Sequence, residues 1–210
     1  MKRLKIIGTV CLLVCATNVS KAQISQWTSG SGGNDHYYQL VLAAAGITWL
    51  DANTAAQNAG GYLATLTSAS ENTFVYNLAA GTSSAWFIDA PNNGIGPWLG
   101  GYQSPASAEP AGGWNWVTGE TWSYTNWASG EPSNYIGIED RLNLFGSQTL
   151  MAGTWNDFPS GGNADGPAIA YIIEYNSSPV PEPSTYAAIF GALALIGAIT
   201  IRKRAKQVQV

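Results

Sequence analysis

The 210-residue chain is poor in cysteine and histidine, and each shortage excludes a class of site. Both cysteines, Cys11 and Cys15, fall in an N-terminal apolar run, so a chain that loses this run has no disulfide and no cysteine-ligated metal. The one histidine, His36, is too few for a zinc site of three histidines, and its place near the edge of the expected domain argues against a catalytic triad.

Positive charge is also scarce, because charged residues make up only 10% of the chain, against about 25% in typical domains. Between Lys21 and Arg202 the one basic residue is Arg141, whereas all 13 acidic residues lie there and leave this interval with a charge of −12. Nucleic-acid binding needs clustered Lys and Arg, so we expect no nucleic-acid partner. Cations and neutral sugars remain compatible. The abundant residues, 24 glycines and 9 tryptophans, favour a loop-rich fold with aromatic anchors.

The N-terminus has the pattern of a secretory signal peptide over residues 1–22. Lys2, Arg3 and Lys5 precede an apolar run over 6–16, and small residues at Ser20 and Ala22 occupy the positions that a signal peptidase reads. The apolar run is shorter than the roughly 20 residues that a membrane helix needs. We therefore expect export, with residues 23–34 as a linker to the domain.

The C-terminus has three successive segments. Residues 177–184 are expected to be a linker, the uncharged run 185–201 predicts a transmembrane helix, and 202–210 is a basic tail that should stay cytoplasmic. The linker contains Pro181, Glu182 and Pro183, and the tail begins with Arg202, Lys203 and Arg204.

This order resembles the bacterial Pro-Glu-Pro (PEP-CTERM) sorting tail, which exosortase-type enzymes recognise. The resemblance implies an exosortase-type partner and a membrane anchor through the helix before processing. It then implies the surface or extracellular matrix of a Gram-negative-type bacterium. An ordinary C-terminal anchor is the alternative.

Between these ends the sequence predicts an α+β domain. Strand-like residues occupy 37–43, and Thr48 with Asp51 begins a helix that ends at Gly60-Gly61. A short strand is expected over 62–66, and Ser68 with Glu71 begins a second helix that runs to about residue 79. Further strands are expected at 98–100 and 168–175. Residues 101–160 show no convincing long helix, and so long an irregular stretch is usually functional.

Several short motifs in this order resemble the C-type-lectin-like family over residues 35–176. They are Thr48-Trp49, Gly60 to Ala64, Trp98-Leu99-Gly100, Trp114-Asn115-Trp116, Asn126-Trp127, Gly130-Glu131-Pro132, Glu139-Asp140, Trp155-Asn156-Asp157 and Ile172 to Tyr175. The resemblance implies a C-type-lectin-like domain with two helices, small antiparallel sheets and a long irregular loop region. It also implies a binding protein rather than an enzyme.

The family usually has two disulfides, and here other residues stand at the four aligned positions. Ala56 and Ile173 stand at one pair of positions. The resemblance implies an apolar contact there between the first helix and the last strand. Arg141 and Ser160 replace the other. We expect Arg141 to hold this loop by bonding to Asp140, to Glu139 or to a carbonyl near Ser160.

Glu131, Glu139, Asn156 and Asp157 all offer oxygen ligands, with no His or Cys nearby. Such a set suits calcium, which takes 6–8 oxygens, and argues against zinc or copper. In the resembled family these positions hold calcium, the ion binds two neighbouring sugar hydroxyls, and a cis peptide precedes Pro132. The family motif is Glu-Pro-Asn, whereas Ser133 stands at the ligand position here, and Asn134 reaches it only if the loop shifts by one residue. The candidate calcium ligands are Glu131, Ser133, Asn134, Glu139, Asn156 and Asp157; the candidate sugar-binding residues are Glu131, Asn134, Glu139, Asn156 and Asp157.

The sequence leaves alternatives open. Asn and Asp also stabilise turns by bonding to nearby backbone, so these residues are also compatible with a purely structural role. Two carboxylates are what a glycosidase requires, but the sequence offers no obvious apolar pocket to raise one pKa. The tryptophans suit sugar stacking or, more commonly, a core. The favoured function is calcium-dependent carbohydrate binding, to a sugar or polysaccharide; the alternative is a structural or adhesive protein that binds protein without calcium.

Overall fold

The structure is a computed structural model that describes residues 23–89, 91–104, 108–147 and 152–179. The expected signal peptide, the Pro-Glu-Pro motif, the apolar segment 185–201 and the basic tail lie outside these residues. Within the described ranges, no helix combines the length and the apolar character that crossing a membrane requires.

Two helices begin where their capping residues predict. Helix α1 spans Trp49–Asn58, and the Thr48 side chain accepts a hydrogen bond from the Asp51 amide at 3.1 Å. Helix α2 spans Ala69–Ala80, and Ser68 accepts one from the Glu71 amide at 3.2 Å. In both cases a side-chain oxygen satisfies an amide that has no partner within the helix.

The strands form one mixed sheet instead of the separate small antiparallel sheets that we expected. The path β1-β2-β9-β5-β7-β8 is antiparallel except for a parallel bridge from Trp98 on β5 to Tyr171 on β9, which joins the two halves. β3 pairs with β9, and β4 and β6 pair with β5. The strands are β1 (Ile24–Gln26), β2 (Tyr37–Leu42), β3 (Tyr62–Leu63), β4 (Phe87–Ile88), β5 (Asn93–Gln103), β6 (Trp114–Trp116), β7 (Arg141–Ser147), β8 (Thr154–Phe158) and β9 (Ala170–Tyr175).

Residues 23–34 are not a linker. They contain β1, which pairs with β2, and a short 3-10 helix, η1 (Ser29–Ser31). Trp27 is buried, and its ring stacks on Phe74 of α2 at 5.8 Å between centroids. The domain therefore begins near residue 24, because the apolar contact of Trp27 fixes this segment to the core.

Two buried clusters lie on the sheet. One contains Ala56 of α1 and Ile173 of β9, in agreement with the apolar replacement expected for a disulfide. The other contains Trp114, Trp116 and Trp155, with Trp122 and Trp127 packed against it, so the core interpretation of these tryptophans is correct. The buried members of both clusters run from Trp27 to Tyr175, so the segment 23–179 contains all of the core that the described residues form.

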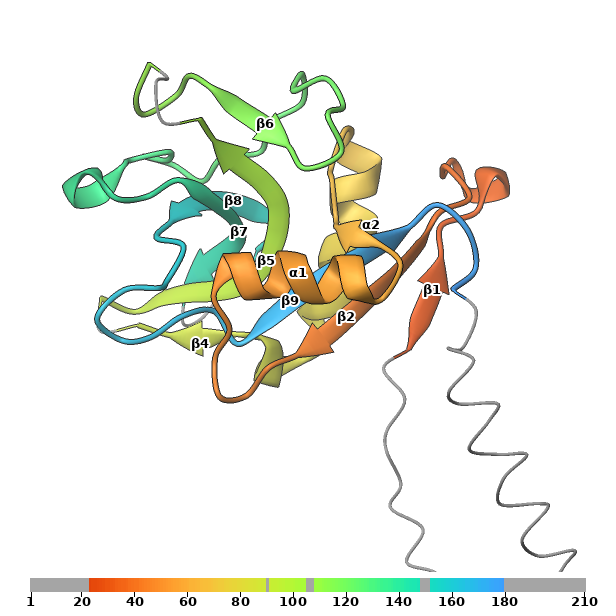
Figure 1. Cartoon of the computed structure of the whole chain (residues 1–210), viewed down its shortest axis with the longest axis horizontal. Helices are drawn as coiled ribbons and strands as arrows, with labels where there is room; N and C mark the ends of the chain where they lie inside the picture. Colours follow the sequence, from red (N-terminus) through yellow and green to blue (C-terminus); the bar gives the residue numbers. More distant parts are fainter. Residues whose placement is uncertain (1–22, 90, 105–107, 148–151, 180–210) are drawn as a thin grey trace, which may run out of the picture.

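Both ends of the described chain leave the domain on the side of β1 (Figure 1). The short 3-10 helix η3 (Tyr135–Gly137), in the long loop, projects at the opposite side of the view. The loop region is thus remote from the points where the chain enters and leaves the domain.

Candidate functional site

The candidate ligands come from two neighbouring parts of the fold. Asn156 and Asp157 lie on β8, whose partners on β7 are Asn143 and Leu142. The others lie in the loop 131–139, which follows Gly130 in the left-handed region (φ 94°) and starts with a cis peptide between Glu131 and Pro132. The resemblance implied this cis peptide, and the structure contains it.

Two of these residues hold the loop in place. The buried Asp157 carboxylate accepts hydrogen bonds from the amides of Ser133 at 2.9 Å and Asn134 at 2.7 Å. The side-chain oxygen of Asn134 accepts one from the Glu139 amide at 3.2 Å. Asn134 therefore joins the start of the turn to Glu139 through its side chain. Ser133 lines the adjoining cleft and Asn134 does not.

The other four line a cleft of about 670 Å³: Glu131, Ser133, Glu139 and Asn156. Glu139 is buried, and its Oε2 accepts bonds from the Tyr135 amide at 2.6 Å and the Ser133 hydroxyl at 3.1 Å. Glu131 Oε2 is buried without a hydrogen-bond partner among the described residues. Glu131, at the cleft wall, thus has a buried and unsatisfied carboxylate oxygen, which would gain from a cation or a donor group.

Burial raises the pKa of both cleft carboxyls. The pKa of Glu131 is raised to about 7, chiefly by burial, with the Asp157 charge adding to it. The pKa of Glu139 is also raised to about 7 by burial and by the charges of Asp157 and Glu131, although its bonds from Tyr135 and Ser133 oppose this. The expectation that no apolar environment raises a carboxyl pKa here is wrong, because Phe145, Phe158 and Ile138 also line the cleft.

The pKa values of Glu131 and Glu139 do not separate the acid and the nucleophile or base that a glycosidase needs. Such an enzyme keeps one carboxyl protonated while the other is ionised, so the two environments must push the pKa values apart. Here both pKa values move in the same direction to about 7. These pKa values therefore do not assign one carboxyl as an acid and the other as a base.

Arg141 neutralises a neighbour of the site instead of the site itself. Its Nη1 lies 2.8 Å from Asp140 Oδ2 and donates to the Asp140 carbonyl at 2.8 Å, as expected. Its guanidinium lies over the Trp49 ring, 4.8 Å from the centroid, and the Trp49 amide donates to the Ser160 carbonyl. Arg141 therefore links this part of the loop to α1, and the pairing leaves the Glu139 carboxylate without a cationic partner among the described residues.

The chemistry of the donors fits calcium in part. No group of three or more His, Cys, Asp or Glu side chains suited to a metal ion occurs in the described ranges. Of the ligands expected from the sequence, two carboxylates, one amide and one hydroxyl line the cleft, and the carboxylates of Asp89 and Asp165 line it as well. These side chains offer oxygen to a hard cation. Backbone oxygens, water or ligand hydroxyls would have to complete the 6–8 ligands that calcium takes.

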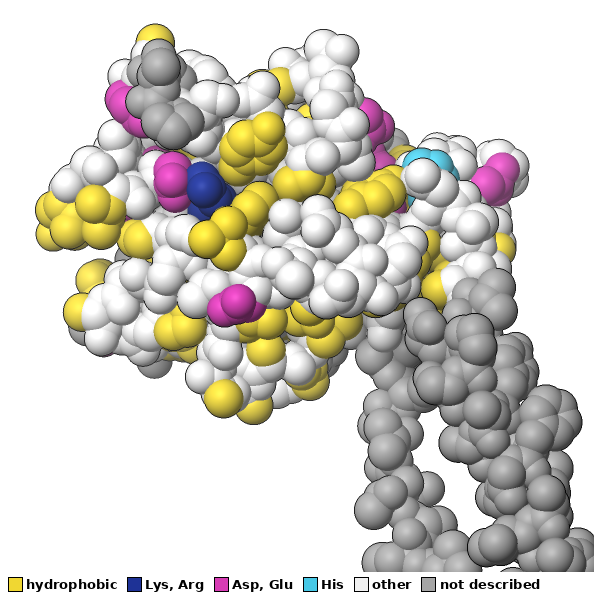
Figure 2. All heavy atoms as spheres, viewed as in Figure 1, with side chains coloured by type: hydrophobic (Ala, Val, Ile, Leu, Met, Phe, Trp, Pro, Cys, Tyr) yellow, Lys and Arg dark blue, Asp and Glu magenta, His cyan; other side chains and the backbone are white. Residues whose placement is uncertain are grey.

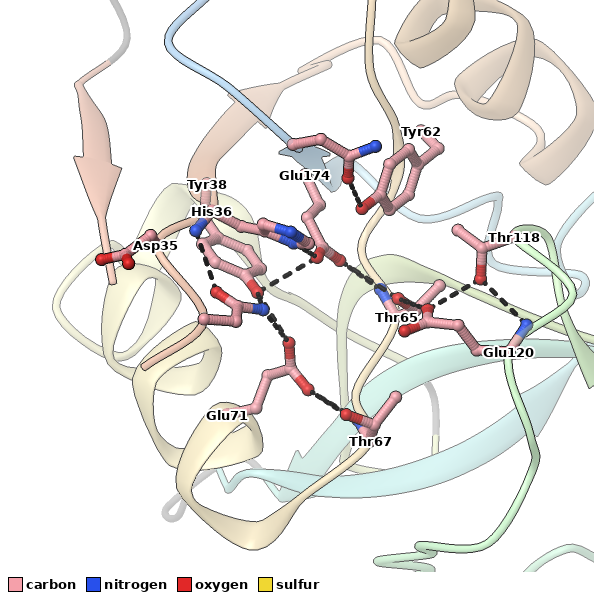
Figure 3. Close-up of polar contacts among 12 residues, drawn as sticks. Asp35, His36, Tyr38, Tyr62, Thr65, Thr67, Glu71, Thr118, Glu120 and Glu174 are labelled. Atoms are coloured by element: carbon pink, nitrogen blue, oxygen red, sulfur yellow. Dashed lines mark hydrogen bonds and ion pairs between the residues drawn. The ribbon is translucent and has the colours of Figure 1, made fainter. Parts of the chain in front are cut away.

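A second polar cluster joins Glu174 of β9 to Tyr38 of β2 and Glu71 of α2, and no sequence motif indicated it (Figure 3). Glu174 Oε1 contacts His36 Nδ1 at 2.7 Å and lies 3.2 Å from the Tyr38 hydroxyl, while its Oε2 accepts from the Thr65 amide. Tyr38 donates to Glu71 Oε1 at 2.6 Å. Both carboxylates bond through both oxygens, so the cluster fixes β2, β9 and α2 together and leaves no free position for a ligand.

In calcium-free buffer we expect the domain to lose stability as the pH rises from about 5 to about 8. The folded pKa values of Glu131 and Glu139, about 7, exceed the value of about 4.3 for an unfolded Glu. The stability that such groups contribute is complete below the unfolded pKa and is lost as the pH rises through the folded pKa. Thermal unfolding in a chelator across this range measures the slope.

Two matched variants test whether these carboxyls cause the change of stability with pH. Glu139→Gln should flatten the slope, whereas Glu109→Gln, at an exposed position, should leave it unchanged. A melting temperature that increased over the whole range in the unsubstituted domain would contradict the burial of these carboxyls.

Comparison with known proteins supports the resemblance to the C-type-lectin-like family. The chain is 31% identical over 101 residues to C-type lectin domain family 4 member G of Mus musculus, a match that covers 48% of this chain and 31% of that protein. It is 30% identical over 137 residues to the perlucin-like protein of Mytilus galloprovincialis, which covers 64% of this chain and 80% of the mussel protein. The chain belongs to the C-type-lectin-like family. No protein-family model matches it.

A solved structure agrees with the fold of this C-type-lectin-like chain. The calcium-free form of a Ca²⁺-dependent type II antifreeze protein matches with a TM-score of 0.50 and 20% identity, over 68% of this chain and 93% of that one. At this identity the likeness shows the fold alone. Because the chain spans only about a third of the mouse relative, the activity of that whole protein does not follow for this one.

Proposed function

We propose that this C-type-lectin-like domain binds a neutral saccharide through calcium held in the 670 Å³ cleft, on a protein exported to the cell surface or matrix. The single observation that carries the proposal is the cleft itself, where two carboxylates without a cationic partner among the described residues lie beside an amide and a hydroxyl. Glu131, Glu139, Asn156 and Ser133 would supply side-chain oxygens to the ion. The bound ion would offset the charges of the two carboxylates and present open positions to sugar hydroxyls.

The rest of the loop supports the same role. Asp157 holds the Ser133 and Asn134 amides, and Glu139 holds the Tyr135 amide, so the ligand-bearing loop is fixed by side chains from within the site. An ordered first layer of ligands needs this kind of support from hydrogen bonds behind it. The mouse relative is a lectin by name, which agrees with sugar as the ligand class.

Export and anchoring complete the proposal. The N-terminal signal, the Pro-Glu-Pro motif and the apolar run 185–201 would place the domain outside a bacterial membrane until an exosortase-type enzyme processes the tail. The described chain ends on the side opposite the η3 loop (Figure 1). An anchor at that end would leave the cleft facing away from the membrane.

The test is a glycan array probed with the domain of residues 23–179, in calcium and in chelator. We expect a sugar signal that calcium supports, together with a rise of about 2.7 kcal/mol in the free energy of unfolding at a calcium concentration of 100 times Kd. Glu139→Gln should abolish both, and Glu109→Gln should keep both. A domain with no calcium-induced shift in melting temperature at millimolar calcium would refute the calcium site.

One observation favours a second function, a structural or adhesive role by protein binding without calcium. Arg141 pairs with Asp140, and Ser133 replaces the stronger amide ligand of the family motif. The loop nevertheless borders a cleft lined by Glu131, Glu139 and Asn156, which supports the saccharide site. Binding of a matrix protein that persists in chelator, without any glycan signal, would favour the second function.

A further inference from the structure

The loop between Asn134 and Glu139 exposes three large hydrophobic side chains. Tyr135 is 69% exposed, Ile136 73% and Ile138 52%. In Figure 2 a group of hydrophobic side chains stands at this projecting loop. Single exposed hydrophobics need no explanation, but three on one short loop indicate a contact surface.

The backbone of the loop is strained in order to present them. Asn134 (φ 45°) and Ile136 (φ 51°) both lie in the left-handed region, and Gly137 (φ 76°) follows. Asparagine and glycine are common there, whereas a β-branched isoleucine is a genuine outlier. Ile136 is not needed by the core, since its side chain is exposed. Because no core packing of Ile136 compensates for this backbone strain, the strain points to a contact outside the domain.

The three side chains are one wall of the cleft already described. Phe145 and Phe158 extend its apolar lining inward, and Glu131, Glu139 and Asn156 form its polar part. No Lys or Arg lines it among the described residues, whereas Asp89 and Asp165 add negative charge. An anionic ligand is therefore disfavoured. A volume of about 670 Å³ lies within the range of roughly 300–1,000 Å³ found for small-molecule sites and exceeds the needs of one sugar ring.

We propose that the cleft selects a neutral saccharide that carries an apolar substituent, such as an aryl or alkyl aglycone or an ester-linked acyl group. The sugar hydroxyls lie at the polar part, and the substituent packs against Tyr135, Ile136 and Ile138. This inference rests on the proposed saccharide function and adds the chemical class of the ligand. The acidic lining disfavours an anionic substituent, and the hydrophobic side chains of Tyr135, Ile136 and Ile138 favour an apolar one.

The experiment is isothermal titration of the 23–179 domain, in millimolar calcium, with methyl and phenyl glycosides of glucose, mannose, galactose and N-acetylglucosamine. We expect the phenyl glycoside of each bound sugar to bind about tenfold more tightly than its methyl partner, because burial of the ring removes apolar surface from water. Ile136→Gly and Ile138→Ser should each remove most of this advantage. Leu50→Ser, at a 57% exposed position on α1 outside the cleft lining, should leave it unchanged.

Ile136→Gly also separates binding from folding. Glycine accepts the left-handed conformation, so the melting temperature should stay equal or rise while the phenyl advantage falls. Equal binding of methyl and phenyl partners would overturn the apolar subsite and leave the saccharide function standing. Absence of binding by any glycoside, with or without calcium, would overturn the proposed function and this inference with it. A dimer in sedimentation equilibrium that Ile136→Gly dissociates would overturn the subsite by assigning the loop to a second copy of the chain.

Discussion

Trp116→Ala is expected to lower the free energy of unfolding by about 3–5 kcal/mol, the cost of emptying a large buried aromatic site. Trp116 is 1% exposed, and its ring lies 4.4 Å from that of Trp122 and 5.8 Å from that of Trp155, between centroids. Deletion of the ring would leave a cavity beneath the loop region, since the neighbouring rings are themselves packed on one another. Urea denaturation of the 23–179 domain measures the loss.

Trp116→Phe is the matched control. The indole Nε1 of Trp116 is buried without a hydrogen-bond partner in the described part of the chain. Phenylalanine keeps an aromatic ring and removes this unsatisfied donor, so the cost should stay below about 1.5 kcal/mol. Calcium response and sugar binding should persist in Trp116→Phe. If Trp116→Ala instead kept full stability and lost only sugar binding, the tryptophans would be a stacking platform and not a core.

Glu174→Ala is expected to destabilise the domain by about 3–5 kcal/mol, because removal of one partner leaves buried polar groups unpaired. The change would remove the acceptor of the Thr65 amide, at 2.9 Å, together with the contact to His36 and one of the acceptors of Tyr38. Figure 3 shows that these bonds tie the segment at the start of β2 to β9 and to the segment between β3 and α2. Burial raises the pKa of the Glu174 carboxyl, so its protonated form is comparatively favoured in the folded protein.

Glu174→Gln distinguishes charge from hydrogen bonding. It keeps one acceptor oxygen and removes the charge that burial disfavours, so it should cost clearly less than Glu174→Ala. Glu120→Gln, at the exposed end of the same cluster, should cost no more than about 1 kcal/mol. Equal and small effects of all three variants in urea denaturation would show that the cluster does not hold these elements together.

Features that depend on near neighbours could be predicted from the amino-acid sequence alone. Thr48 and Ser68 are predicted as caps because their partners, Asp51 and Glu71, lie three residues away, and both caps form. The tryptophan core follows from the density of tryptophan, and the set of Glu131, Glu139 and Asp157 follows from the resemblance to the C-type-lectin-like family.

Features that depend on distant partners emerged only in the folded chain. Pairs such as Tyr37 with Tyr175 and Trp98 with Tyr171 join residues far apart in the chain, so no local pattern predicts one mixed sheet or the ordering of residues 23–34. His36 is a lone histidine in the sequence, and only the fold places it on Glu174. The sequence shows Tyr135, Ile136 and Ile138 as a hydrophobic run in a polar loop. Only the fold shows that they line the cleft. Capping is a contact within one turn, whereas pairing, burial and raised pKa values arise from groups that are brought together when the whole chain folds.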